Sequence, residues 1–402
     1  MYGRCCCLGC LGAIVAWGCF SERFILQSEL DNSWTSLESS SLMLSDADED
    51  ASANTARGSI RSPVVAVGYT VPVFVYCSHK NWTLRDIELS NYWPIVATIW
   101  EAFEDVGLLV EFVPENKHVE LLSRIDEAIK DKVMPIVLLL LWEYVTPRGL
   151  YTKRAMESPI QHFGRHGAYV IMYNLQTRDS FLKGMLKLGK QWKVREIWDA
   201  SASAADVYKL PNGNNKIVRV FPPGCAKRLR LNTLRNPPFR DNWHVSFVGS
   251  WTEQPDEKRQ LWNASWLIVQ QPQHVHVNTH GEWKSYIEER PLQVSLHTDL
   301  NHAKAFEALS GAMLLSNGAC LFSEHSGLDE VLWKGVVHFV SAEEANHIFR
   351  SFSGDPEKIR QCQAEAESRF CWHFSPSRLL HKSGFNEQLR NITSGELFAH
   401  VP

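Results

Sequence analysis

The chain has 402 residues, of which 45% are hydrophobic and 21% charged, so it is long enough for more than one globular domain. Its formal net charge of −4 argues against the strongly basic surface that most nucleic-acid-binding proteins carry. We therefore expect no nucleic acid among its partners.

The N-terminal residues 1–20 are predicted to be a signal peptide or a signal anchor. The stretch Cys5 to Phe20 has no charged residue, but it is shorter than the about 20 residues of most transmembrane helices. Residues 21–67 are polar, acidic and serine-rich, which is typical of a disordered stem. This layout predicts a glycoprotein of the secretory pathway, in the Golgi or ER membrane, with membrane attachment through residues 5–20.

From residue 68 the chain alternates between strand-like and helix-like segments. Pro94 opens the first helical pattern and Gly107 ends it. Helices are predicted at 94–107 and 119–131. Strands are predicted at 71–77, 108–114, 134–141, 168–175, 194–201 and 216–224. Strands and helices in this alternation predict a doubly wound α/β domain over residues 68–238.

The alternation restarts after a proline-rich boundary at 235–243. Strands are predicted at 244–250, 275–281 and 292–297, and helices at 257–269, 341–352 and 355–370. Ser341 and Glu344 have the spacing of a capping box. A second α/β domain is therefore expected over residues 239–382, followed by a tail at 383–402. The predicted fold class is α/β, with two Rossmann-like, doubly wound domains that face a central cleft.

Residues 303–316, AKAFEALSGAMLLS, place one carboxylate in an otherwise apolar segment. We predict a helix that carries Glu307, a turn at Ser310-Gly311 and a strand from Ala312 to Leu315. In open α/β sheets, ligands bind outside the carboxyl ends of the strands. A carboxylate there can accept hydrogen bonds from the two vicinal hydroxyls of a ribose, and Ser310 and Gly311 can offer backbone N–H groups. The alternative is a structural acid that caps the helix or lies on its exposed face.

Several enzyme classes lack their signature motifs in this chain. No G-x-G-x-x-G follows the first strand of either domain, which argues against a dinucleotide-dependent oxidoreductase. Neither G-x-x-x-x-G-K-[ST] nor G-x-S-x-G occurs, which argues against a P-loop enzyme and an α/β-hydrolase. Asp46, Asp48 and Asp50 lie in the stem without a flanking strand or helix, so we predict no metal site there.

Five cysteines lie outside the first twenty residues, namely Cys77, Cys225, Cys320, Cys362 and Cys371. Their number is odd and no C-x-x-C occurs among them, so they indicate neither a zinc site nor a dense disulfide framework.

Four segments, in order, resemble GT-B glycosyltransferases, most closely the bacterial spore-coat type. They are REIWDASASAADVYK…IVRVFPPG, HVSFVGSW…EKRQLW, HAKAFEALSGAMLLSN, and GLDEVLWKG followed by DPEKIRQCQAEAESRFCWHFSPSR. The resemblance covers residues 190–382. It implies a metal-independent glycosyltransferase that moves a sugar from a nucleotide-sugar donor to a glycan, protein or lipid acceptor. The nucleotide sugar is a substrate, so no cofactor is expected.

The resemblance also implies roles for single residues. Glu307 matches the glutamate that holds the nucleotide ribose. Asp299 takes the place of the first acid of E-x7-E beside the donor sugar, and it is one methylene shorter. Lys304 stands where the spore-coat type has an arginine, so it cannot make the two parallel hydrogen bonds to a phosphate that a guanidinium makes.

Other candidates come from the neighbouring segments. Lys258 and Arg259 are candidates for the diphosphate, with a solvated helix face as the alternative. Gly249 and Ser250 can let the backbone approach the donor. His79 follows the first strand, where an acceptor-side base can sit, with a structural histidine as the alternative.

Three other interpretations stay open. The segment LDEVLWKG is also similar to exostosin-like inverting transferases, which share the GT-B fold. A non-catalytic lectin-like or scaffold protein can keep the same fold. A two-lobed, periplasmic-type ligand-binding protein is the third. A screen of nucleotide-sugar donors separates the first of these from the other two, because only a transferase releases a nucleoside diphosphate.

Overall fold

The computed structural model describes residues 71–77, 82–90, 92–140, 159–174, 179–206, 217–230, 245–248, 256–263, 290–297, 305–352 and 355–397. The residues predicted as a signal segment and a stem, and the strand predicted at 275–281, lie outside these residues. Within the described ranges, no helix combines the length and the apolar character that crossing a bilayer requires.

The first sheet has six strands, all parallel, in the order β2-β1-β3-β4-β5-β6. The strands are β1 (Pro72–Cys77), β2 (Leu109–Pro114), β3 (Ile136–Leu140), β4 (Tyr169–Asn174), β5 (Glu196–Asp199) and β6 (Ile217–Val220). Every residue of β3 and β4 is buried, as expected for central strands that helices cover on both faces. All six strands were predicted from the sequence, and the structure confirms them.

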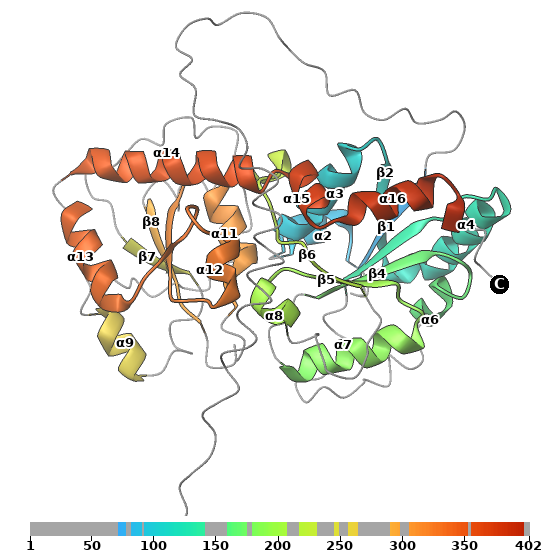
Figure 1. The fold of residues 1–402 in the computed structure, drawn as a ribbon, viewed down its shortest axis with the longest axis horizontal. Coiled ribbons are helices and arrows are strands. Elements are labelled where there is room, and N and C mark those ends of the chain that lie inside the picture. Colours follow the sequence, from blue (N-terminus) through green and yellow to red (C-terminus); the bar gives the residue numbers. More distant parts are fainter. Residues whose placement is uncertain are drawn as a thin grey trace, which may run out of the picture. The chain divides into compact units, whose positions relative to one another are not determined.

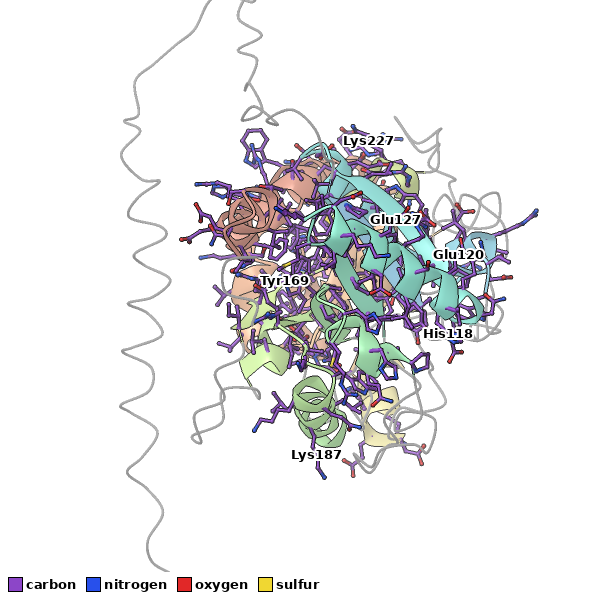
Figure 2. The ribbon with its side chains drawn as sticks, turned by 90° about the vertical axis from the view of Figure 1, so that its right-hand side faces the viewer. His118, Glu120, Glu127, Tyr169, Lys187 and Lys227 are labelled. Atoms are coloured by element: carbon purple, nitrogen blue, oxygen red, sulfur yellow. A yellow bond between two sulfur atoms is a disulfide. The ribbon has the colours of Figure 1, made fainter. Side chains whose placement is uncertain are left out.

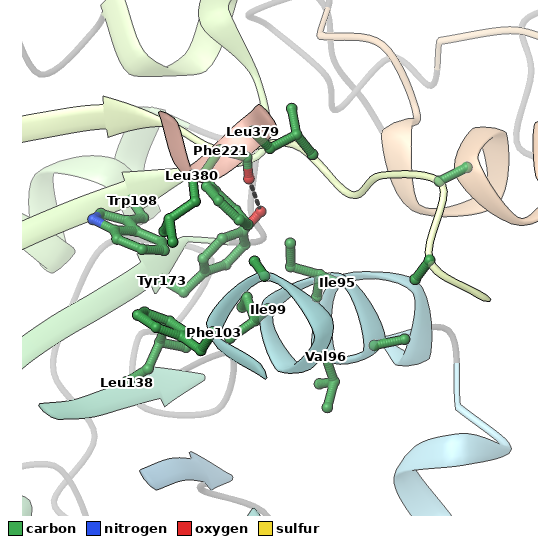
Figure 3. Close-up of a cluster of buried hydrophobic side chains, with 14 of the residues drawn as sticks. Ile95, Val96, Ile99, Phe103, Leu138, Tyr173, Trp198, Phe221, Leu379 and Leu380 are labelled. Atoms are coloured by element: carbon green, nitrogen blue, oxygen red, sulfur yellow. Dashed lines mark hydrogen bonds between the residues drawn. The ribbon is translucent and has the colours of Figure 1, made fainter. Parts of the chain in front are cut away.

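One face of the first sheet packs against one helix that precedes most of its strands in the sequence and two helices from the C-terminal region (Figure 1). The helices are α3 (Trp93–Glu104), α15 (Pro376–Lys382) and α16 (Phe385–Thr393). Figure 3 shows Ile99 and Phe103 of α3 close to Tyr173 and Trp198 of the sheet. In the same cluster the Tyr173 hydroxyl donates to the carbonyl of Phe221, 2.5 Å away.

The opposite face carries the alternate residues of the same strands, such as Phe74, Leu139 and Met172. It packs against α4 (His118–Lys130), α6 (Ile160–Phe163) and α7 (Asp179–Gln191). Figure 2 shows Glu120 of α4 and Lys187 of α7 on the outside, whereas Tyr169 of β4 lies among the interior side chains. The first half is therefore a three-layer α/β/α arrangement.

The second sheet has four described strands, all parallel, in the order β10-β9-β8-β7. They are β7 (Val245–Val248), β8 (Leu292–Ser295), β9 (Cys320–Ser323) and β10 (His338–Phe339). The helices of this half are α9 (Asp256–Asn263), α11 (Ala308–Leu315), α12 (Leu328–Leu332), α13 (Ala342–Phe352) and α14 (Pro356–His373). Two parallel sheets with helices confirm the predicted α/β fold class. The capping box is also confirmed, because the backbone N–H of Glu344 donates to Ser341 Oγ.

Short elements connect these layers. They are α2 (Leu84–Glu88), the 3-10 turn η1 (Glu115–Lys117), α8 (Ala202–Asp206) and the 3-10 turn η2 (Lys227–Leu229).

The strand predicted at Ala312–Leu315 is wrong, because these residues form the second half of α11. Alanine, methionine and leucine are strong helix formers, and a short apolar run does not by itself distinguish a buried helix from a buried strand. The strand of this region is β9, which follows the turn at Gly318, where φ is +78°.

Residues 383–402, expected as a tail, contain α16. Its Phe385, Leu389 and Ile392 are buried in the same apolar cluster as α3 and the first sheet. The centroid of the Phe385 ring lies 5.0 Å from that of Trp198 on β5. The C-terminal end of the chain is thus part of the core of the first half.

Four of the five cysteines considered above form two disulfides, Cys225–Cys371 and Cys320–Cys362. The first joins the segment after β6 to α14, and the second joins β9 to α14. The fifth cysteine, Cys77, is buried at the end of β1. The odd number concealed this pairing, which depends on the fold and not on spacing.

Candidate functional site

The carboxyl ends of the two sheets are joined by direct hydrogen bonds. After β5, the Ser201 hydroxyl and the Ala202 N–H donate to the carboxylate of Asp329, each at 2.7 Å. The Ser203 hydroxyl donates to the carbonyl of Ser326, which follows β9, at 2.9 Å. Ligands of parallel α/β sheets bind at this end of the strands. The junction is therefore where a site that uses both halves is expected.

Glu307 lies beside this junction, at the start of α11. Its neighbour Phe306 donates its backbone N–H to Asp329, at 2.9 Å. The carbonyl of Glu307 accepts the N–H of Gly311, which begins the helical hydrogen bonding of α11. The sequence thus brings an acid to the amino end of a buried helix, beside the carboxyl ends of both sheets.

The carboxylate of Glu307 is half-buried, and no other described residue donates a hydrogen bond to it or pairs with it as a cation. Burial raises the pKa of Glu307 from 4.5 to about 7. A desolvated carboxylate without compensating donors is costly to ionise, which is the physical cause of this shift. The site therefore holds an acceptor that a ligand with hydroxyl donors can satisfy.

Ser310 and Gly311 both lie on α11, but the role of Gly311 differs from the one predicted. Its N–H already donates to the carbonyl of Glu307, so it is not available to a ligand. A Cβ at this position would lie 2.6 Å from the Phe306 ring. The glycine is needed so that Phe306 can pack on the helix. Ser310 is half-buried in the first turn.

Lys258 lies at the carboxyl ends of β8 and β9. Its Nζ is 2.5 Å from Glu324 Oε2 and donates to the carbonyl of His297 at 2.7 Å. In this arrangement the positive charge of Lys258 is neutralised within the protein by Glu324. Two of its three N–H donors are used, so one donor is left for a diphosphate oxygen. The side chain of Arg259 lies outside the described residues.

His297 and Asp329 are two residues of this region that the sequence did not single out. His297 is buried, and its Nε2 lies 3.0 Å from the hydroxyl of Ser326. Burial raises the pKa of Asp329, although hydrogen bonds from Ser201 and from backbone N–H groups counteract this. The signal that the sequence offered for Asp329 was an aspartate two residues after Gly327, and the structure places it in the first turn of α12.

The remaining predicted site residues, His79, Gly249, Ser250, Asp299 and Lys304, lie outside the described residues.

In the part of the chain that the structure describes, one cluster has the proximity of metal ligands, namely Cys320, His338 and Cys362. Its two sulfurs are joined as a disulfide, so they cannot act as thiolate ligands in this state.

Among solved structures, the chain shows distant likenesses. One of them is to sucrose-phosphate synthase from Thermosynechococcus elongatus, at 12% identity and a TM-score of 0.44, over 80% of this chain and 99% of that one. A likeness at this level carries no inference about reaction or substrate. No family model and no curated protein sequence matches the chain.

Proposed function

We propose that the protein is a glycosyltransferase that moves a sugar from a nucleotide-sugar donor to a glycan, protein or lipid acceptor. Support comes from two parallel α/β sheets joined at their carboxyl ends, and from an acid at that junction. The four segments that resemble GT-B enzymes include this acid, in HAKAFEALSGAMLLSN. In this proposal the second half binds the donor, and Glu307 accepts hydrogen bonds from the hydroxyls of its ribose.

The observation that carries the proposal is the contrast between Glu307 and the structural acids of the same chain. Glu196 is buried, and its carboxylate accepts hydrogen bonds from Tyr169, Trp198 and Arg219. Asp329 is also buried and accepts from one hydroxyl and three backbone N–H groups. Glu307 is half-buried, and among the residues that the structure describes it has no such donors. A structural acid is normally satisfied by the protein, whereas a ligand-binding acid is satisfied by its ligand.

The chemistry proposed needs no metal. A leaving nucleoside diphosphate gains negative charge in the transition state, and oriented dipoles and positive side chains stabilise that charge. Lys258, Arg259 and Lys304 are the proposed positive groups, and Gly249 and Ser250 the proposed backbone contacts. Asp299 is proposed beside the donor sugar and His79 as the base that activates the acceptor.

We further propose that the protein works in the secretory pathway, attached to a membrane through residues 5–20. The two disulfides support this location, since disulfides persist in oxidising compartments and are rare in the cytosol.

Thermal shift with UDP, GDP and ADP, each with and without EDTA, tests the proposal. We expect at least one of these nucleotides to raise the melting temperature, and EDTA to leave that shift unchanged. A ligand at a hundred times its Kd stabilises the folded state by about 2.7 kcal/mol, which is measurable as a shift of several degrees. Failure of all three nucleotides would contradict donor binding, and a shift that EDTA abolishes would contradict metal independence.

A further inference from the structure

We propose that Asp329 is a positioning residue, which fixes the segment carrying Glu307 to the start of α8 and so places the donor-binding acid relative to the first sheet. This inference rests on the proposed function for the role of Glu307. The contacts of Asp329 rest on the structure alone.

The carboxylate of Asp329 joins segments that are far apart in the sequence. Oδ1 accepts the backbone N–H groups of Ala202 and Ser203, at 2.7 and 3.4 Å. Oδ2 accepts the Ser201 hydroxyl at 2.7 Å and the Phe306 N–H at 2.9 Å. The side chain is fully buried, so water does not replace these donors. One carboxylate therefore holds the start of α8 and the residue before Glu307 at the same time.

Movement of Phe306 is transmitted directly to Glu307, because consecutive Cα atoms are about 3.8 Å apart across a rigid peptide. The Phe306 ring is held as well, since it packs edge-on against Trp333 at 4.9 Å between centroids. With the ring packed and the N–H bonded to Asp329, the backbone that leads to Glu307 has little freedom. The position of the Glu307 carboxylate then depends on Asp329.

A carboxylate is the side chain that suits four converging donors, because each of its two oxygens accepts two hydrogen bonds. The amide of asparagine has the same shape but only one acceptor oxygen. In one orientation its NH₂ group would face the N–H of Phe306, and in the other the N–H groups of Ala202 and Ser203. Asp329→Asn must therefore break the link on one side.

Amide hydrogen exchange of Asp329→Asn tests the positioning without any ligand. We expect the amides on the side that loses its acceptor, either Phe306 together with Gly311 or Ala202, to exchange about ten-fold faster than in the wild type. Gly311 reports on Glu307, because its N–H donates to the Glu307 carbonyl at 3.0 Å. The matched control is Glu196→Gln, which weakens another buried carboxylate and should lower the melting temperature while leaving these three amides unchanged. Unchanged exchange in Asp329→Asn would overturn the inference.

Isothermal titration with UDP, GDP and ADP gives the functional arm. Asp329→Asn should lower the affinity for the nucleotide that the wild type binds by about ten-fold, whereas Glu196→Gln should leave this affinity unchanged. Faster exchange with unchanged affinity would overturn the positioning role. If the wild type binds none of the three nucleotides, the proposed function fails. The amide hydrogen exchange experiment still decides whether Asp329 holds the segment that carries Glu307.

If Asp329→Asn does not fold, Ser201→Ala serves in its place, since it removes one donor and keeps the carboxylate. The same amides should then exchange about five-fold faster, and unchanged exchange would again overturn the inference.

Discussion

A chain that ends at Lys382 should not form a stable first half, because it lacks α16. Phe385 of this helix lies 5.0 Å from Trp198 and 6.0 Å from Phe103, measured between ring centroids. Its removal, together with that of Leu389 and Ile392, would expose an apolar face of the first sheet. Phe385→Ala alone should cost about 3–5 kcal/mol, a large part of the about 5–15 kcal/mol that stabilises a typical domain.

Urea unfolding followed by tryptophan fluorescence measures this effect. Trp372 provides the matched control, because it is an aromatic residue of the same C-terminal region that is 62% exposed and stacks on Arg378. Trp372→Ala should change the free energy of unfolding by less than about 1 kcal/mol. If the chain ending at Lys382 unfolds at the same urea concentration as the full chain, α16 is not part of the core.

Glu307→Gln should weaken nucleotide binding about ten-fold to a hundred-fold. The substitution keeps the size of the side chain but removes the charge that accepts the ribose hydrogen bonds. A hydrogen bond to a charged group is worth about 1.5–3 kcal/mol, and about 1.4 kcal/mol corresponds to a factor of ten in affinity. The change in affinity is measured by isothermal titration of both proteins with the nucleotide that raises the melting temperature of the wild type.

The stability of the same variant without ligand distinguishes a ligand-binding acid from a structural one. The folded-state pKa of Glu307, about 7, lies above its ordinary value of 4.5, so ionising this group opposes folding. The wild type should therefore lose free energy of unfolding as the pH rises from about 4.5 through about 7, and Glu307→Gln should lose less. Near pH 8 the variant should be at least as stable as the wild type. A variant that is less stable there, with unchanged affinity, would identify Glu307 as a structural acid.

Local patterns were sufficient for most of the fold. The central strand β3 is a continuous apolar run, and the spacing of Ile95, Ile99 and Phe103 predicted the buried face of α3. The pattern failed at Ala312–Leu315, where four apolar residues fit a buried helix as well as a buried strand. The sequence analysis also missed α16, because it expected a tail at 383–402 and no helix there.

The candidate site could be predicted only in part, because some of its features are local in the sequence and others depend on the fold. Glu307 stood out because its neighbours in the chain are apolar, which is a local property. The importance of Asp329 depends on Ser201 and Ala202, which are 128 and 127 residues away in the sequence. The pairing of Lys258 with Glu324 is likewise set by the fold, so the sequence could not show that its charge is neutralised.

The most direct test of the glycosyltransferase proposal is turnover of nucleotide-sugar donors, with the products identified by mass. The full chain would be incubated with a panel of UDP-, GDP- and ADP-sugars, with and without candidate acceptors, beside the Glu307→Gln variant. We expect the wild type to release a nucleoside diphosphate from one donor and the variant to do so much more slowly at the same subsaturating donor concentration. Release at equal rates by both proteins would contradict the role of Glu307, and no release from any donor would contradict the proposed function.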